Sequence, residues 1–390
     1  MRRLLSARLA LAIGLACAAG AATWIQVLPY LRSAALVVRA ADLQGPWLGR
    51  LSRWGTRPVV AQDIDIPTRS ARLRARVYSP AKGTSGRTIL LSAGLNPRGL
   101  DEPRLARLAH TIAERGVRVI TPELPDLIDF RITPRLADQI EDAGSWAAGR
   151  PSLSPDGRVG LVGISFSGGL SVVAAGRPAL RDRVAYVVSL GGHGDLPRTL
   201  RYLSTGRLPD GRVHPAHDYG VVVVLHNVVE ALVPPDQVDA LRKGVRTFLL
   251  ASTIYMTDPT RGARMADDAR SMEATLPDPA RTLLHYVNTR NTAALAPLLE
   301  PCLPDFTSDP ALSPERSPAP RARVFLLHGA DDNVIPASET NQLAGSLAAR
   351  GVPTRVLITP LISHAEVDRT PAAVDVLALI RFWADVLRAG

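Results

Sequence analysis

Cysteine is scarce in this chain. Cys17 and Cys302 are the only cysteines among its 390 residues. Cys17 falls in an apolar N-terminal stretch, so removal of that stretch as a targeting segment leaves Cys302 alone in the rest of the chain. No intrachain disulfide can then form there, and an oxidising compartment is neither required nor excluded.

Lysine and aromatic residues are also rare. Lys82 and Lys243 are the only lysines, although the formal net charge is +10, and aromatic residues make up 5% of the chain. No run of basic residues alternates with aromatics, so we expect no nucleic-acid partner and attribute the arginine excess to genome composition. Attraction to an anionic membrane surface is compatible with this charge.

Metal-ligand spacing is absent among the histidines between residues 196 and 320. None of them lies at a spacing typical of zinc sites, and we expect neither a metal nor an organic cofactor. These residues are His214, His217, His226 and His285.

The N-terminus carries a targeting signal. Arg2, Arg3 and Arg8 precede an uncharged run over residues 9–31, which is long enough to span a bilayer with the rest of the chain exported. Ala19-Gly20-Ala21 resembles a signal-peptidase site, whose cleavage would release the protein instead. We favour an uncleaved anchor over residues 1–41, because the apolar run continues past that site. A buried N-terminal helix is the remaining alternative.

Strand and helix patterns alternate through residues 42–390. A chain of this length with 46% hydrophobic content can form one large domain, and the alternation predicts an α/β fold with a mostly parallel sheet. Helices are expected at Pro103–Glu114, Thr133–Ala148 and Ser338–Arg350. The expected strands are Val59–Ile66, Arg72–Tyr78, Thr88–Leu91, Val117–Thr121, Arg158–Ile164, Val184–Leu190, Arg323–His328 and Arg355–Thr359.

A long insertion interrupts this alternation. About 130 residues separate the strand ending at Leu190 from the one starting at Arg323, far more than a crossover needs. We assign the core to residues 58–195 and 321–390 and a helical cap to residues 196–320. Its expected helices are Leu196–Leu203, Tyr219–Leu232, Pro235–Ala251 and Ala280–Leu299, although the valine run Val221–Val224 favours strand by propensity.

One serine lies at a predicted strand-to-helix corner. In Gly163-Ile164-Ser165-Phe166-Ser167, an apolar strand precedes Ser165 and an apolar helix follows it. A corner this tight needs small residues two positions before and after the serine, and Gly163 and Ser167 meet that need. The pattern predicts a nucleophilic serine.

An acid and a histidine follow later strands. Arg323–His328 runs into a loop with Asp331 and Asp332, and His364 comes shortly after the strand ending at Thr359. The chain order Ser, Asp, His, with each residue past the C-terminal end of a strand, matches a known arrangement of the catalytic triad.

With these motifs the chain resembles α/β-hydrolase-fold serine hydrolases of the esterase, lipase and dienelactone-hydrolase kind, over roughly residues 58 to 388. The family's H-G-x-x-D-x-x-V-P acid loop matches His328, Gly329, Asp332 and Pro336, with Ile335 in the Val position. That register selects Asp332 over Asp331, whose alternative role is an Asx cap.

The resemblance implies roles for the matched residues. Ser165 would be the nucleophile, His364 the base and Asp332 the carboxylate that orients it. The backbone N–H groups of Phe166 and Leu95 would form the oxyanion hole, although Ala93-Gly94 replaces the family's usual His-Gly before Leu95.

Two other residues near these motifs have alternative interpretations. Ser167 also lies between small residues, but a corner there would start inside the helix, so we interpret it as a packing residue whose hydroxyl bonds to the helix backbone. His193, in the glycine-rich loop after the strand Val184–Leu190, is either exposed to solvent or turned toward the active site.

The expected function is hydrolysis of a carboxylic ester, or less readily of an amide, through an acyl-enzyme. The substrate would be a small-molecule or acyl ester. Acyltransferase, lyase or haloperoxidase chemistry on the same triad, or a non-catalytic binding module, are the alternatives. Substrate identity and oligomeric state are not determined by the sequence.

Overall fold

A single eight-stranded sheet forms the centre of the computed structural model, which describes residues 26–39, 46–83, 87–362 and 372–389. The strand order is β1-β2-β4-β3-β5-β6-β7-β8, with β2 antiparallel to both of its neighbours and the other pairs parallel. The α/β-hydrolase fold expected from the sequence is confirmed. The strands are β1 (Val59–Pro67), β2 (Arg72–Pro80), β3 (Thr88–Ser92), β4 (Arg118–Pro122), β5 (Val159–Ile164), β6 (Val184–Leu190), β7 (Arg323–Gly329) and β8 (Thr354–Thr359).

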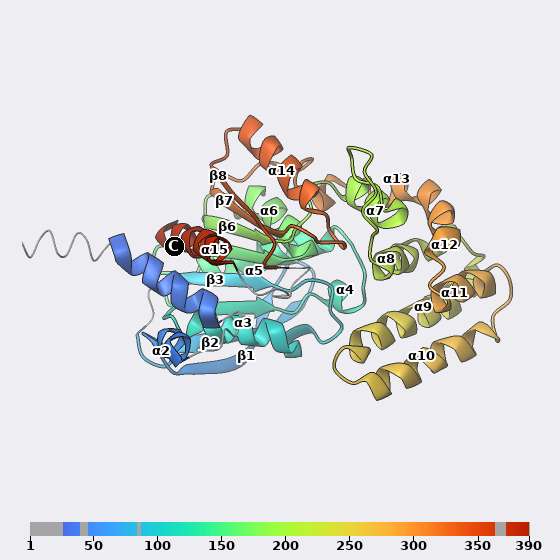
Figure 1. Ribbon diagram of the computed structural model, residues 1–390, viewed down its shortest axis with the longest axis horizontal. Helices are drawn as coiled ribbons and strands as arrows, with labels where there is room; N and C mark the ends of the chain where they lie inside the picture. Colours follow the sequence, from blue (N-terminus) through green and yellow to red (C-terminus); the bar gives the residue numbers. More distant parts are fainter. Residues whose placement is uncertain (1–25, 40–45, 84–86, 363–371, 390) are drawn as a thin grey trace, which may run out of the picture.

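Helices cover both faces of this sheet (Figure 1). One face packs against α5 (Arg135–Ala148), α6 (Phe166–Gly176) and α14 (Ala337–Ala349). The other packs against α3 (Pro103–Ala113), α15 (Ala373–Ala389) and a helix over residues 26–39. Strands β3 and β5 are buried on both faces, which explains their continuous apolar sequences. Short helices α2 (Pro46–Arg53), η1 (Gly99–Asp101) and α4 (Pro125–Ile128) complete the core.

The insertion after β6 is helical and lies to one side of the sheet (Figure 1). The valine run falls inside helix α8 (Asp218–Val228), so its burial among apolar neighbours outweighs strand propensity. The expected helix over Ala280–Leu299 is instead two helices, separated near Arg290, whose φ is 53°. The cap elements are α7 (Leu196–Thr205), α8 (Asp218–Val228), η2 (Val229–Ala231), α9 (Pro235–Tyr255), α10 (Pro259–Glu273), α11 (Ala280–Asn288), α12 (Thr292–Leu299), η3 (Glu300–Cys302), α13 (Leu303–Phe306) and η4 (Pro310–Leu312).

The helix over residues 26–39 packs directly on the core. The Ser33 hydroxyl donates to the carbonyl of Ile380 in α15 at 2.6 Å, and Arg39 pairs with Glu114 at 3.2 Å. Leu36 and Val37 are buried in the apolar cluster on this face of the sheet. Among the described residues, no helix is long and apolar enough to cross a bilayer. Most of the proposed anchor, residues 1–25, lies outside them.

Candidate active site

Ser165 occupies the corner between β5 and α6. Its φ of 55° and ψ of −129° are strained for a residue with a side chain, and its N–H donates to the carbonyl of Leu190 in β6 at 2.7 Å. Gly163 explains how the corner closes, because a Cβ there would lie 2.1 Å from the carbonyl oxygen of Ser167. The sharp strand-to-helix turn expected from the sequence is present at Ser165.

Two backbone segments border the Ser165 side chain. Phe166 is the first residue of α6, where a backbone N–H has no acceptor within the helix and the helix dipole favours negative charge. The loop after β3 approaches from the other side: a Cβ on Gly94 would lie 2.9 Å from Ser165 Cβ and 3.4 Å from its Oγ. Leu95 follows in that loop and packs against the core. The structure thus brings both predicted oxyanion segments beside the serine.

Ser167 is fully buried, and its hydroxyl donates to the carbonyl of Ala93 at 2.5 Å. The bond runs to the loop after β3 and not to the helix backbone that we expected. This contact ties the loop containing Leu95 to the start of α6, which gives Ser167 a structural role. Its burial disfavours it as a nucleophile.

Asp332 and Asp331 differ in environment. Asp332 is 2% exposed, and its Oδ1 accepts the N–H groups of Val334 at 2.9 Å and Ile335 at 3.0 Å. Asp331 is exposed. The buried carboxylate is therefore the one that the sequence register selected, and it also forms the Asx turn that we had assigned to its neighbour.

The acid loop lies at the same edge of the sheet as Ser165. Ile164 pairs with Leu190, and Leu190 pairs with Leu327, so β5, β6 and β7 end side by side. Between them, a Cβ on Gly191 would lie 3.6 Å from Asp332 Oδ2. β8 adjoins β7 and ends at Thr359 at this edge. His364 comes five positions later in the sequence and lies outside the described residues.

His328, in β7, contacts the acid loop through its imidazole ring. Its ring is buried, with Nδ1 2.6 Å from Thr340 Oγ1 and Nε2 2.7 Å from the carbonyl of Ile335. Because a carbonyl oxygen only accepts, Nε2 carries the proton. Nε2 also lies 3.4 Å from Asp332 Oδ2. His328 therefore fixes the turn that presents Asp332.

The cap contacts the acid loop from the opposite side. His214 Nε2 lies 3.2 Å from the carbonyl of Asp332, and the His217 N–H donates to the carbonyl of Asn333 at 2.9 Å. Burial, and then the nearby Asp332 carboxylate, raises the pKa of Tyr202 in α7. The cap therefore covers Asp332 and limits its contact with water.

His193 belongs to this site, although sequence reasoning left its position open. Its ring is fully buried and stacks on Phe166 at 4.5 Å between centroids, with 8° between the planes. Nε2 lies 2.8 Å from the Leu312 carbonyl, and burial lowers the pKa of the imidazole, which is therefore neutral. A Cβ on Gly169 would lie 2.5 Å from the ring, so the Gly168-Gly169 pair was the sequence signal of this close approach.

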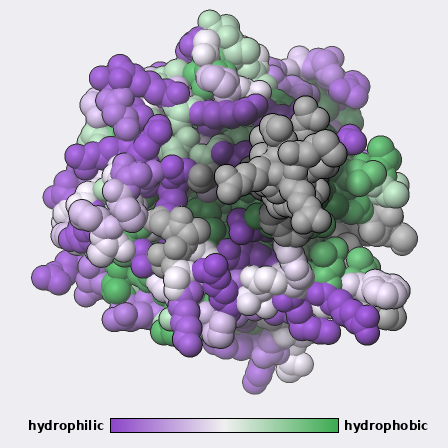
Figure 2. All heavy atoms as spheres, turned by 90° about the vertical axis from the view of Figure 1, so that its left-hand side faces the viewer, coloured by the Kyte–Doolittle hydropathy of each residue, from purple (hydrophilic) through white to green (hydrophobic). Residues whose placement is uncertain are grey.

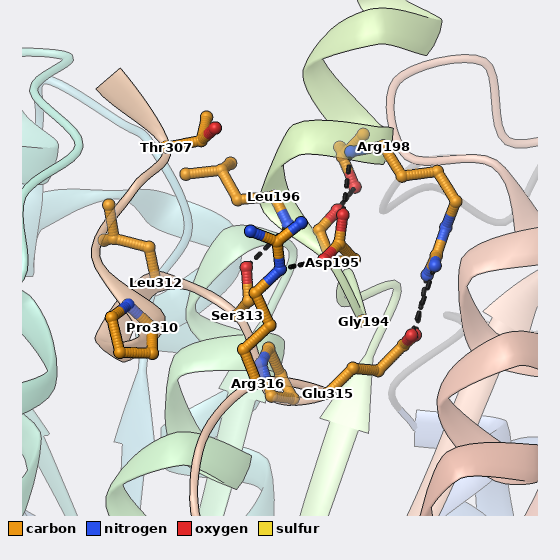
Figure 3. Close-up of polar contacts among 12 residues, drawn as sticks. Gly194, Asp195, Leu196, Arg198, Thr307, Pro310, Leu312, Ser313, Glu315 and Arg316 are labelled. Carbon is orange, nitrogen blue, oxygen red and sulfur yellow. Dashed lines mark hydrogen bonds and ion pairs between the residues drawn. The ribbon is translucent and has the colours of Figure 1, made fainter. Parts of the chain in front are cut away.

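A network of charged side chains holds the loop that contains His193, and Figure 3 shows its pair between Arg198 and Glu315. Glu339 in α14 is 1% exposed, and its Oε2 accepts the N–H groups of Gly194 at 3.0 Å and Asp195 at 3.1 Å. Arg198 lies 2.6 Å from Glu339 and 2.6 Å from Glu315. The network joins the strand that enters the cap to the segment that leaves it.

The same network closes the base of the cap at two further points (Figure 3). Asp195 pairs with Arg316 at 2.6 Å, and Ser313 Oγ accepts the Leu196 N–H at 2.9 Å. Asp195 also caps α7 by accepting the Arg198 N–H at 3.0 Å. The two ends of the insertion are therefore fixed to one another and to α14.

A small, largely apolar cavity adjoins the Gly94 loop next to Ser165. Its polar side chains come from one asparagine and one glutamate. The lining residues are Ala93, Gly94, Asn96, Gly99, Pro122, Glu123, Leu124, Leu127 and Ile128. Within the described ranges, no cluster of three or more His, Cys, Asp or Glu side chains is arranged to hold a metal ion.

Comparison with known proteins finds similarity in solved structures. No protein-family model matches the sequence, and no curated protein matches it. An acylaminoacyl peptidase of Pyrococcus horikoshii aligns with a TM-score of 0.47 and 12% identity, over 88% of this chain and 43% of the peptidase. An esterase of Pyrobaculum calidifontis aligns with a TM-score of 0.45 and 15% identity, over 94% of this chain and 92% of the esterase. The chain thus spans less than half the length of the peptidase.

Proposed function

We propose that this protein is a serine hydrolase that cleaves a carboxylic ester, and less readily an amide, through an acyl-enzyme on Ser165. The strained backbone of Ser165 at the tip of β5 carries the proposal, because such strain persists only where surrounding structure enforces it and it exposes the hydroxyl at the sheet edge. The placement of Asp332 and the Gly94 loop at the same edge supports it.

In the proposed mechanism, His364 removes the proton of the Ser165 hydroxyl as it attacks the substrate carbonyl. Asp332 fixes the tautomer of that imidazole and stabilises its charged form. The N–H groups of Phe166 and Leu95 stabilise the oxyanion, a contribution of about 10²–10³ in kcat for one such donor. His364 then protonates the leaving alcohol, and water releases the acid by the same steps.

The apolar cavity beside Gly94 would receive one side of the substrate. Leu124, Leu127 and Ile128 line it with apolar surface, which suits an acyl or alkyl group and not a charged one. Its volume is only about 10 Å³, so no more than the terminal methyl of such a group would enter it. We assign the remaining substrate contacts to the cap, which reaches Asp332 through His214.

A fluorophosphonate probe tests the serine assignment. We expect the full chain to be labelled at Ser165, as located by peptide mass, with label absent from Ser165→Ala and retained by Ser167→Ala. Label on Ser167 would refute the assigned corner, and no label on folded protein would favour a binding module. Partition of the acyl group between water and an added alcohol separates hydrolase from acyltransferase chemistry.

The two neighbouring aspartates, Asp331 and Asp332, provide a test variant and a matched control for the assignment of the triad acid. Asp332→Asn should slow labelling by orders of magnitude, because the wrong histidine tautomer costs about 10⁴-fold in a comparable triad. Asp331→Asn should leave the rate nearly unchanged, since that side chain is exposed. Equal rates in the two variants would contradict the assignment of Asp332.

We further propose that residues 9–25, the part of the uncharged N-terminal run that precedes the helix over residues 26–39, tether the protein to a membrane with the catalytic domain exported. The uncharged run behind three arginines supports this, as does attraction of the +10 chain to anionic lipid. Fractionation of the full chain should place it with membranes, and deletion of residues 1–25 should release it. Soluble full-length protein with an intact N-terminus would contradict the tether.

A further inference from the structure

A second cavity, of about 400 Å³, lies at the opposite edge of the sheet from Ser165. Three of its lining residues come just before strands: Arg87 before β3, Val117 before β4 and Asp156 before β5. Ser165 follows the other end of β5, and none of the residues that line the cavity belongs to the candidate active site. Its size is within the range of small-ligand sites, near the lower end.

The inner walls of this cavity are apolar. They come from the sheet and from the three helices that cover this face, namely α3, α15 and the helix over residues 26–39. The apolar lining residues are Pro29, Leu36, Ile89, Ile112, Val117, Val162, Trp383, Val386 and Leu387, and Tyr186 adds an aromatic ring. Apolar walls of this kind favour contact with an apolar group over contact with water.

Arginine surrounds the cavity, and its charge is only partly neutralised. Arg87 pairs with Asp156 at 2.6 Å. Arg115 instead donates to the carbonyls of Trp54 at 2.5 Å, Ser52 at 2.7 Å and Ala35 at 3.1 Å, and forms no ion pair within the described chain. Burial lowers the pKa of the Arg115 guanidinium, a sign that this cation is poorly solvated.

Arg32 lies at the solvent side of the cavity. Its side chain is exposed, and its guanidinium has neither a hydrogen bond nor an ion pair with any residue that the structure describes. Figure 2 faces the end of the molecule where the helix over residues 26–39 lies, and hydrophilic residues are spread over much of the part of that face that carries hydropathy colours. An apolar interior with excess positive charge at its border has the polarity of a site for an amphiphile.

We propose that this cavity binds a single-chain amphiphile with an anionic head group. The chain packs against Ile89, Val162 and Val386, and the head group lies toward Arg32 and Arg115. The shared chemistry fits a fatty acid and a lipid with one phosphate monoester head. The proposal does not depend on Ser165, because the cavity and the candidate active site share no residue.

Calorimetric titration of the full chain, in the Ser165→Ala background, tests the proposal with three probes of equal chain length: decanoate, decyl phosphate and decanol. We expect an anionic probe to bind, and decanol to bind about tenfold more weakly, because it lacks the charge. A preference for decanoate identifies a carboxylate head, and a preference for decyl phosphate a phosphate head. Equal affinity for decanol would overturn the anionic head group.

Two substitutions locate the binding. Arg32→Glu should weaken the anionic probes about tenfold, since an attraction becomes a repulsion, whereas Arg264→Glu on the exposed face of α10 should change nothing. Val117→Trp should fill the cavity and abolish binding of all probes. A control for folding uses the same substitution in the chain with the native Ser165. There Val117→Trp should leave fluorophosphonate labelling unchanged, which would show that the fold is retained. Absence of binding to the parent chain, or binding unaffected by both Arg32→Glu and Val117→Trp, refutes the site.

Discussion

The buried carboxylate of Glu339 gives the most direct test of how the cap is attached. Glu339 is 1% exposed, receives two backbone N–H bonds from the loop after β6 and pairs with Arg198. Removing one partner of a buried pair costs about 3–5 kcal/mol, because the other charge stays buried without compensation. The loss in Glu339→Gln should be smaller, because the glutamine side chain still has an oxygen that can accept the two N–H groups and Arg198 is still paired with Glu315. We therefore expect Glu339→Gln to lower the free energy of unfolding by about 2–3 kcal/mol.

An exposed ion pair provides the control. Asp267 pairs with Arg270 at 2.5 Å on α10, with side chains 67% and 56% exposed. Solvent screens such a pair, so Asp267→Asn should cost less than about 0.5 kcal/mol. Urea denaturation of both variants in low salt measures the difference. A loss below about 1 kcal/mol in Glu339→Gln would refute the inferred role of the buried network.

Hydrogen exchange supplies a local readout of the same prediction. The amides of Gly194 and Asp195 donate to Glu339, so their protection should fall in Glu339→Gln and stay unchanged in Asp267→Asn.

A double-mutant cycle adds Arg198→Met, which should cost less in the Glu339→Gln background than in the parent chain, because the two residues share one interaction. Additive losses would show that the pair is not coupled.

Three further outcomes follow from the site and the core. Gly94→Ala should slow fluorophosphonate labelling at least about tenfold, because its Cβ would lie 2.9 Å from Ser165 Cβ, whereas Gly345→Ala, which meets nothing within 4 Å, should not. His193→Ala should slow labelling about tenfold with little change in initial probe binding, since it removes the ring that supports Phe166, and a loss confined to binding would contradict that role. Burial lowers the pKa of His226 to about 4, so its contribution is fully present above about pH 6.5 and is lost, by up to about 3 kcal/mol, as pH falls toward 4. His226→Gln, which keeps a donor for the Asp129 carbonyl, should flatten this pH dependence of urea stability, and parallel curves would count against it.

Sequence reasoning located the serine corner because the requirement there is local. Gly163 must lack a side chain for the turn to close on Ser167, and that need is visible in the sequence as a small residue two positions before Ser165. The choice of Asp332 over Asp331 came from the resemblance to the family's acid-loop motif, and burial agrees with it. His364 stays a prediction from chain order.

Contacts between distant segments were beyond the sequence pattern. His193 lies in a glycine-rich loop, and the sequence left open whether it is exposed to solvent or turned toward the active site; in the structure Leu312, 119 positions later, accepts its Nε2–H. Ser167 had a plausible partner in its own helix but bonds to Ala93 across the sheet edge. The α10 helix was missed as well, because a helix with few buried residues has a weak apolar pattern.

The sequence by itself determined the alternation of strand and helix, the place of the cap and the serine corner, since each depends on side-chain periodicity or on the steric needs of one turn. Only the tertiary structure decided which side chains share a buried environment. Glu339, Arg198 and His193 owe their roles to burial and to partners on other elements, and electrostatic cost depends on that surrounding dielectric and not on residue type. The second cavity likewise exists only where helices from both ends of the chain meet over the sheet.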